Sequence, residues 1–293
     1  MDQLILNGIV NGLIVGGVYA LIGVSLTLLY GVLRVVNFAH GEFVIAGSFL
    51  AYVLFSHLGL PPLLALPIAA IAFFAAGWGL YYVLIPRLSR SDDPELMSFL
   101  MFYGVSIAAA AGMLLVFEAD SRSIDYTFTP ISVPIGPIYV STARLVALAI
   151  AVAISGALAM FLFLTLPGKA LRAAIMNPEA IQIMGVDIVR LSAFAFALAS
   201  ALAGVTGVLV ALVFPAFNAF SGPDYTIIAF IVVVLGGLGN PVGALLAGVI
   251  FGLAEQLATV FLPQSLAQIV GFAILVATIF LRPTGILGSS ARK

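Results

Sequence analysis

The chain contains few of the residues that build enzymes, disulfide frameworks or metal sites. It has no cysteine and only two histidines among 293 residues. The lack of cysteine excludes disulfide bonds and thiolate metal ligands. His40 and His57 are separated by a long apolar segment, so we expect no metal site. No grouping of serine, histidine and carboxylate residues indicates catalysis, and we therefore expect no enzymatic activity.

Charged residues are equally scarce, because Asp, Glu, Lys and Arg make up only 8% of the chain. The net charge of −1 says nothing about partners, because the few charges matter by position. The sequence carries no basic patch that would indicate a nucleic-acid partner. Hydrophobic residues make up 63% of the chain and the mean hydropathy is +1.26, far outside the range of soluble proteins. These values are typical of an integral membrane protein surrounded by a lipid bilayer. The Met-Asp-Gln start lacks a basic region, so we expect an uncleaved first span.

The hydrophobic runs predict an all-α polytopic membrane protein with eight or nine transmembrane helices in a single domain over 1–293. A helix that crosses a hydrocarbon core of about 30 Å needs about 20 residues. Eight segments meet or nearly meet this length, namely 5–30, 41–57, 61–85, 97–118, 142–166, 191–214, 242–262 and 265–281. A further segment, 225–238, is short, and glycines interrupt the chain directly after it. It is either a ninth span or part of a broken or re-entrant element near 225–262.

The basic residues predict the orientation, because Lys and Arg near span ends remain on the cytoplasmic side of a membrane. With the N-terminus outside, only Arg122 and Arg144 lie outside. If 225–262 is a re-entrant hairpin, the number of membrane crossings is still odd. The C-terminus is therefore expected in the cytoplasm in either case. Nine basic residues then lie inside: Arg34, Arg87, Arg90, Lys169, Arg172, Arg190, Arg282, Arg292 and Lys293.

Small residues form a row along the first predicted helix. Gly8, Gly12 and Gly16 recur every four residues, and Ala20 continues the row. Such a face allows the backbone of another membrane helix to approach closely. Two interpretations are open, packing within the chain or contact with another subunit or the transport path.

The least hydrophobic stretch, 167–190, is the only predicted inside loop long enough to hold structure of its own. From Lys169 to Met176, apolar and basic side chains fall on opposite sides of a helix. Asn177 is a good N-cap and Pro178 fits the first helical position. Gly185 can adopt the left-handed conformation that ends a helix. The loop is therefore predicted to form two short helices.

The second of these helices is expected to expose an apolar surface. Glu179 complements its positive N-terminal end, and Ala180, Ile181, Ile183 and Met184 supply the apolar side chains. Exposed apolar surface costs free energy unless something covers it. Either the loop lies on the membrane surface, or the helix inserts into the groove of a partner protein.

The chain lacks a phosphate-binding loop. Its only Gly-Lys pair, Gly168 and Lys169, is followed by Ala170 and has Phe163 where the motif needs a glycine. If transport uses ATP, a partner must therefore hydrolyse it.

Ionisable side chains within spans are costly and usually indicate a function or a pairing. Asn37, His40 and Glu42 are expected at the inner end of the second span, near Arg34. They fit either a structural polar clasp, with Arg34 and Glu42 as an ion pair, or a gate on the translocation path. Glu255 is the other buried-acid candidate, and helix packing and path lining fit it equally well.

Four segments together resemble the LivH-type permeases of branched-chain amino acid ABC importers, in the same order and over nearly the entire chain. The second span begins inside one of them, and the least hydrophobic loop is another. The segments are Leu28 to Glu42 (LLYGVLRVVNFAHGE); Gly168 to Ala173 with Asn177 to Ala180 and Met184 to Val186; Val234 to Ala244 (VLGGLGNPVGA); and Arg282 to Gly288 (RPTGILG).

This resemblance implies a multi-pass permease subunit in the plasma (inner) membrane of a prokaryote. It implies a related second permease, two cytoplasmic ATPases that use ATP and Mg²⁺, and an external substrate-binding protein. Residues 177–185 would be the helix that couples ATP hydrolysis to inward translocation of branched-chain or related small amino acids. This chain itself would bind no cofactor.

The residue patterns and the resemblance together give two sets of candidate site residues. The coupling loop comprises Gly168, Lys169, Arg172, Asn177, Pro178, Glu179, Ile181, Met184 and Gly185. The candidate path or gate comprises Asn37, His40, Glu42, Gly236, Gly237, Gly239 and Glu255. The alternative function is a secondary transporter or channel for a small neutral solute, driven by an ion gradient through Glu42 and Glu255.

Overall fold

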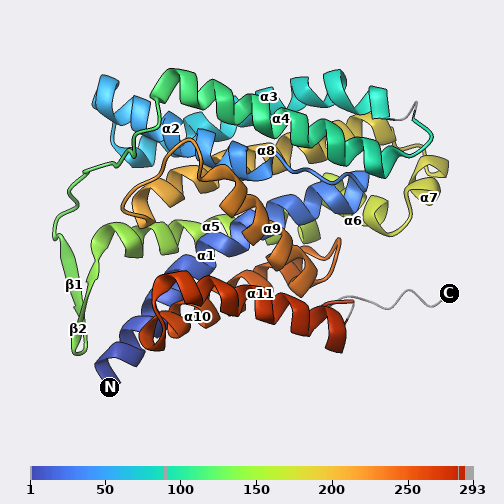
Figure 1. Cartoon of the computed structure of the whole chain (residues 1–293). Coiled ribbons are helices and arrows are strands. Elements are labelled where there is room, and N and C mark those ends of the chain that lie inside the picture. The colour runs from blue at the N-terminus through green and yellow to red at the C-terminus, as the bar shows by residue number, and fades with distance from the viewer. Residues whose placement is uncertain (1, 89–90, 283, 288–293) are drawn as a thin grey trace.

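The computed structural model describes residues 2–88, 91–282 and 284–287, and it forms an elongated bundle of helices (Figure 1). The elements are α1 (Asp2–Leu33), α2 (His40–Leu58), α3 (Pro62–Leu88), α4 (Pro94–Phe117), β1 (Ser132–Ile135), β2 (Ile138–Ser141), α5 (Thr142–Leu164), α6 (Leu166–Met176), α7 (Pro178–Ile183), α8 (Ile188–Val213), α9 (Gly222–Gly236), α10 (Pro241–Phe261) and α11 (Gln264–Leu281).

Each predicted span corresponds to one of these helices. Among the described residues, α1, α2, α3, α4, α5, α8 and α10 are long and apolar enough to cross a membrane. The apolar parts of α9 and α11 are shorter. The prediction of an all-α polytopic membrane protein is therefore confirmed.

The centre of the bundle is formed by α1 and α8, which are buried along most of their lengths. The predicted row of small residues on α1 packs within the chain, against α10. A methyl group on Gly12 would lie 2.8 Å from the Cα atom of Leu253, and one on Gly16 would lie 2.9 Å from the Cα atom of Val249. The row therefore serves close helix packing, the first of its two open interpretations.

The helices form two halves that contain the same elements in the same order. The central helices of the two halves, α1 and α8, run in opposite directions along the bundle (Figure 1). The first half is α1 to α4 and the second half is α8 to α11, with α5 to α7 between them. In each half a long central helix leads through a non-helical segment into a second helix. The third helix of each half packs along the central helix of the other, α10 on α1 and α3 on α8. In Figure 1, α3 and α4 lie along one side of the bundle and α10 and α11 along the opposite side.

Both second helices begin in the interior of the bundle. The segments before α2 and α9 turn in the same way, because Asn37 Oδ1 accepts from Ala39 N at 2.9 Å and Asn218 Oδ1 accepts from Phe220 N at 3.0 Å. The two helix starts touch, since a methyl group on Gly41 would lie 2.6 Å from the backbone N of Thr226. The N-terminal ends of α2 and α9 thus meet inside the protein.

This arrangement corrects the expected position of residues 37–42. They were expected at the inner end of the second span, but His40 Nε2 lies 2.8 Å from Ser25 Oγ, eight residues before the end of α1. At 1.5 Å per residue this is about 12 Å inside the bundle. The reason is that the segment after Leu33 is not helical and runs back between the helices before α2 starts.

The predicted broken element near 225–262 consists of two helices, α9 and α10, joined by a turn at 237–240. Gly237 and Gly239 have φ values of 100° and 77°, which glycine adopts easily and other residues rarely do. Asn240 Oδ1 caps α10 by accepting from Gly243 N at 3.0 Å. Because α9 starts inside the bundle, it is a partial span.

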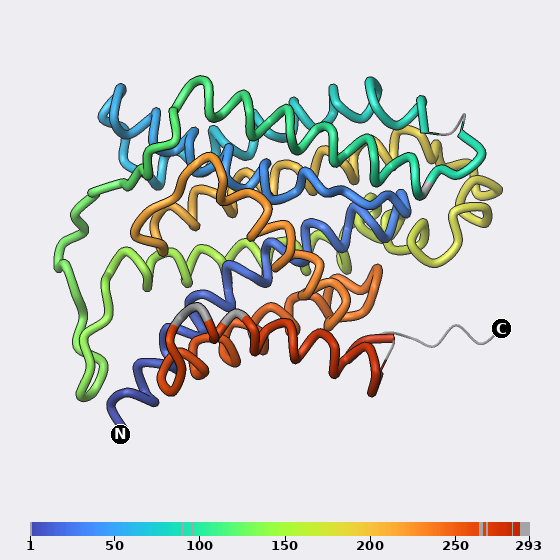
Figure 2. The backbone as a smooth tube through the Cα atoms, viewed as in Figure 1, coloured from blue at the N-terminus to red at the C-terminus, as the bar shows by residue number. Residues whose placement is uncertain are grey.

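The two ends of the bundle differ. One end carries the start of α1 and the β1–β2 hairpin, and the other carries α6 and α7 (Figures 1 and 2). The segment before the hairpin is joined to the bundle at Arg122. Arg122 N donates to Phe217 O at 2.8 Å, and Phe217 N donates to Arg122 O at 3.0 Å. Arg122 and Arg144 belong to the hairpin end, while Lys169 lies in α6 and Arg190 in the first turn of α8 at the other end. Arg90, Arg292 and Lys293 lie outside the described residues.

Candidate functional site

The first candidate site is the pair of short helices α6 and α7, at the end of the bundle away from the hairpin. Thr165 caps α6, accepting from Gly168 N at 3.2 Å. Gly168 is required at the corner between α5 and α6, because a methyl group there would lie 2.7 Å from the Cα atom of Leu162. Leu171 is buried in the core. The chain therefore enters α6 through a tight corner and anchors it to the bundle.

The predicted amphipathic pattern of α6 is confirmed. Leu171 and Ala174 face the bundle, and Lys169 is exposed on the other side. The Arg172 guanidinium lies over the Phe163 ring, 4.2 Å from its centroid. The apolar face packs against protein, so this helix is not simply adsorbed on a lipid surface.

The predicted start and stop signals of α7 are also confirmed. Asn177 Oδ1 accepts from Glu179 N at 3.1 Å and from Ala180 N at 3.0 Å, with Pro178 at the first helical position. Gly185 has a φ of 84° and donates to Gln182 O at 2.9 Å. A short helix closed at both ends keeps its shape when a force acts on it.

The apolar surface of α7 differs from the predicted one in one residue. Ile181 was expected on the exposed side, but only 4% of it is exposed, and it packs into the core. Ile183 and Met184 are 88% and 81% exposed, and Met176 at the end of α6 is 83% exposed. Ile181 thus anchors α7, while Met176, Ile183 and Met184 project from the protein.

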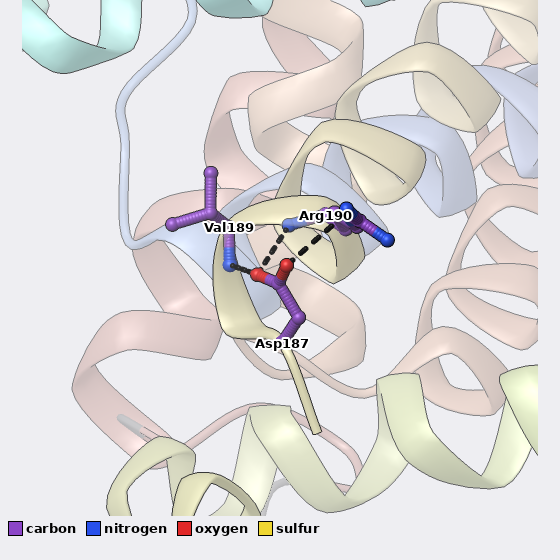
Figure 3. Close-up of polar contacts among 3 residues, drawn as sticks. All are labelled: Asp187, Val189 and Arg190. Carbon is purple, nitrogen blue, oxygen red and sulfur yellow. Dashed lines mark hydrogen bonds and ion pairs between the residues drawn. The ribbon is translucent and has the colours of Figure 1, made fainter. Parts of the chain in front are cut away.

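Sequence reasoning missed the role of Asp187, which starts α8 directly after this loop. Figure 3 shows its carboxylate accepting from Val189 N at 3.0 Å and Arg190 N at 3.1 Å. Its other oxygen lies 3.2 Å from Arg190 Nε in an exposed ion pair. The signal was present, because an Asp that precedes an apolar helical run is a frequent N-cap.

Two of the segments that resemble the permease family meet at one side chain, Ile175 of α6. A methyl group on Gly31 would lie 3.0 Å from Ile175 Cγ1 and 3.2 Å from the Cα atom of Gly239. The chain after α11 joins the same region, since Ile286 N donates to Leu235 O at 2.8 Å and Asn240 Nδ2 donates to Leu287 O at 2.8 Å. The end of α1 and the α9–α10 turn therefore lie close to α6, and the C-terminal segment bonds to the end of α9 and to Asn240.

The second candidate site surrounds Glu42 at the junction of α2 and α9. Only 1% of Glu42 is exposed, and its Oε1 accepts from Ser106 Oγ of α4 at 3.1 Å. The carboxyl group lies directly against Gly222, the first residue of α9. The N-terminal ends of α2 and α9 both lie beside this carboxyl group. Glu42 Oε2 has no hydrogen-bond partner among the described residues.

The other polar residues of this segment face elsewhere. His40 bonds to Ser25, as described above, and its Nδ1 has no partner in the described part of the chain. Asn37 is fully buried, and its Nδ2 also lacks a partner there. Arg34 is exposed and forms no ion pair with Glu42, so the expected pair is absent and Ser106 takes its place.

The remaining candidate path residues lie in two further places. Gly236, Gly237 and Gly239 belong to the α9–α10 turn beside α6. Glu255 of α10 lies apart from them, where the Tyr19 hydroxyl donates a hydrogen bond to its carboxyl group. The candidate path residues are therefore divided among three regions, of which only the glycine turn touches the α6–α7 pair.

Comparison with known proteins gives a consistent family. Residues 8–279 match the family described as "Branched-chain amino acid transport system / permease component". The permease protein BraD of Pseudomonas aeruginosa, named for high-affinity branched-chain amino acid transport, is 29% identical over 97% of this chain and 95% of its own. LivH of Escherichia coli, with the same description, is 28% identical over 95% and 94%.

A shorter match relates the chain to a different permease. LivM of Methanocaldococcus jannaschii, named a probable branched-chain amino acid transport permease, is 33% identical over 32% of this chain and 28% of its own. No solved structure matches the chain. The match of the family to nearly the whole chain, together with the multi-pass helical fold, shows that this protein belongs to the family of membrane permease components of branched-chain amino acid transport systems.

Proposed function

We propose that the chain is a permease subunit of an ABC importer and that α6 and α7 dock a cytoplasmic ATPase subunit. One observation carries this proposal: a helix capped at both ends projects Ile183 and Met184 from the protein, while Ile181 anchors it in the core. Exposed apolar side chains on a short stiff helix suit insertion into the groove of another protein. The charged side chains of this docking unit are Lys169, Arg172 and Glu179. The turn after α7 is formed by Gly185.

The contacts of α6 support a role in transmitting movement. Leu171 anchors α6 in the core, and Ile175 touches the end of α1 and the α9–α10 turn. A displacement of α7 therefore reaches a central helix and a partial span through packed atoms. Packed interfaces transmit such shifts because they do not deform continuously.

The proposed orientation places α6 and α7 in the cytoplasm and the N-terminus and the hairpin outside, following the basic residues. An external binding protein would then approach the hairpin end. Two ATPases would supply ATP and Mg²⁺ chemistry, since this chain lacks a phosphate-binding loop and itself binds no cofactor. The similarity to LivM supports a related permease as the second membrane subunit. We assign residues 1–293 to one permease domain.

The proposed substrates are branched-chain or related small amino acids. The names of the relatives support this class. The few charges and the many small apolar residues of the bundle are compatible with passage of a small zwitterion. No ion gradient is required on this proposal, because the energy comes from ATP hydrolysis in the partners.

A single substitution tests the docking role. Met184→Asp places a charge on the projecting surface, and we expect at least a tenfold loss of the ATPase subunit that copurifies from native membranes. Tyr139→Asp is the matched control, because Tyr139 is 75% exposed in β2 at the opposite end of the bundle. Unchanged ATPase recovery with Met184→Asp, at normal membrane insertion, would contradict the proposal.

One observation favours the alternative function. Partial helices that meet inside a membrane protein, as α2 and α9 do beside Glu42, also occur around ion sites in secondary transporters. Uptake into vesicles that lack ATP, abolished by an ionophore, would support this alternative. Uptake that needs ATP and survives the ionophore would exclude it.

A further inference from the structure

A groove between α2, α3 and α4 is lined, among the described residues, by apolar side chains alone. Its volume is about 370 Å³, and it shares no residue with either candidate functional site. All three helices contribute to its walls. We call this space the apolar groove, and the side chains that line it include Leu50, Val53, Ala72, Ala76, Met113 and Phe117.

Small side chains on α3 and one close contact of α4 create the apolar groove. Ala72 and Ala76 lie one turn apart on α3, and both line the groove without filling it. At the end of α4, Phe117 stacks on Phe49 of α2 with the ring centroids 4.1 Å apart. The stacked rings hold the end of α4 against α2, while the alanines leave the space open on the side of α3.

The apolar groove lies at the depth of the hydrocarbon core of a membrane. All three helices are long and apolar enough to span this core. Counted from Pro62, Ala72 and Ala76 are the eleventh and fifteenth of the 27 residues of α3, so they lie near its middle. The surface beside the groove is apolar too, since Ile71 is 72% and Leu115 is 86% exposed. The groove therefore continues the surface that contacts lipid.

The lining and the size of the apolar groove decide what can occupy it. Water is excluded, because an apolar cavity offers it no hydrogen bonds and stays dry. One turn of a helix with its side chains, about 10 Å wide and 5.4 Å long, has a volume of about 420 Å³. A helix of a partner therefore does not fit into about 370 Å³. An empty groove would forfeit the dispersion contacts of its walls. An acyl chain is thinner than a helix, and it is what a bilayer supplies at this depth.

We propose that the apolar groove binds one acyl chain of a phospholipid from the leaflet at the hairpin end of the bundle. The groove reaches Phe117, the last residue of α4, at that end. Arg122 Nη2 donates to Phe117 O at 3.0 Å, so a positive charge lies beside this end, where it suits the phosphate of a headgroup. A chain in the groove contacts three helices at once, and this lipid therefore exchanges more slowly than its neighbours. The inference does not depend on the proposed docking of an ATPase.

Photolabelling of the protein in its complete complex tests this inference. The complex is placed in nanodiscs of phosphatidylcholine that carries a diazirine in its acyl chain, mixed with an excess of liposomes of ordinary phosphatidylcholine, and then irradiated. Met113 lines the groove, and Leu115 is exposed two residues later on the same helix. After this exchange we expect at least tenfold more label on Met113 than on Leu115. Without the exchange, both residues should be labelled.

A matched pair of substitutions on α3 makes the test specific for the apolar groove. Ala72→Phe fills the groove and should lower the retained label on Met113 at least tenfold. Ala75→Phe is the control, because Ala75 is exposed and does not line the groove. Ala76→Phe, also on the groove, serves if Ala72→Phe does not insert.

Three results would overturn the inference. Label on Met113 that is lost as fast as label on Leu115 would show ordinary lipid contact. Met113 that stays unlabelled in nanodiscs in which Leu115 is labelled would show that another subunit covers the groove. Equal retained label in the Ala72→Phe and Ala75→Phe variants would place the retained chain elsewhere on the protein.

Discussion

The two halves of this permease contain the same elements but differ in how the acid near the start of the second helix is covered. In the first half α4 covers the start of α2, and Ser106 completes Glu42, which is 1% exposed. In the second half the position of Glu42 is taken by Pro223, and the nearest acid, Asp224, is exposed. Burial within one chain requires a partner for each polar group, because an unsatisfied buried group costs about 1–3 kcal/mol. The difference is that the chain itself encloses the acid at the start of α2, whereas the acid near the start of α9 stays exposed.

The largest expected effect follows from the contact between the halves. Gly41→Ala puts a methyl group 2.6 Å from the backbone N of Thr226, which side-chain movement cannot relieve. We expect a loss of about 3 kcal/mol or more in the free energy of unfolding, through overpacking. Unfolding of the purified chain in detergent, followed by circular dichroism, measures it.

Gly79→Ala is the control for this prediction, because nothing lies within 4 Å of a methyl group there. The control should be neutral or slightly stabilising, since alanine favours a helix by up to about 1 kcal/mol over glycine. Equal stability of both variants would show that the helix starts do not touch as closely as described.

The next effect compares the two acids directly. Glu42→Ala removes the acceptor of Ser106 and leaves space beside Gly222, so we expect a loss of about 2 kcal/mol. Asp224→Ala in the isolated chain should change stability by less than about 0.5 kcal/mol, because the Asp224 side chain is exposed. The same unfolding assay applies to both variants. A loss for Asp224→Ala as large as that for Glu42→Ala would remove the distinction between the halves.

The smallest effects concern the start of the second half. Asp187→Ala removes the acceptor for Val189 N and Arg190 N and should cost about 1 kcal/mol. Arg190→Ala breaks only the exposed ion pair and should change stability by less than about 0.5 kcal/mol. Hydrogen exchange of the amides of the first turn of α8 separates the two. Faster exchange with Arg190→Ala than with Asp187→Ala would show that the ion pair, and not the cap, holds this turn.

The sequence predicted the helices well because each depends on local signals. Apolar runs located the spans, and Asn177, Pro178 and Gly185 located α7. These signals act within one or two turns, through hydrophobicity and backbone hydrogen bonding. The pattern for α7 failed at Ile181 because a helix of six residues makes less than two turns, too few to define which side faces the bundle.

The features that depend on contacts distant in the chain were not predictable in the same way. The interior starts of α2 and α9 follow from buried non-helical segments, which a hydropathy window joins to the neighbouring spans. The repeated halves were missed because they share spacing around Asn37 and Gly41, and around Asn218 and Gly222, and not a long similar sequence. The replacement of the expected Arg34 partner of Glu42 by Ser106 depends on where α4 packs.

The most direct test of the account is uptake of a radiolabelled branched-chain amino acid into liposomes that contain the complete complex and its binding protein, with ATP on the side of α7. The account predicts uptake that requires ATP and persists when an ionophore removes ion gradients. Met184→Asp should abolish this uptake and Tyr139→Asp, at the other end of the bundle, should leave coupling to ATP intact. Uptake by Met184→Asp at the normal rate, or uptake that ignores ATP and stops with the ion gradient, would contradict the central claim that α6 and α7 couple this permease to an ATPase.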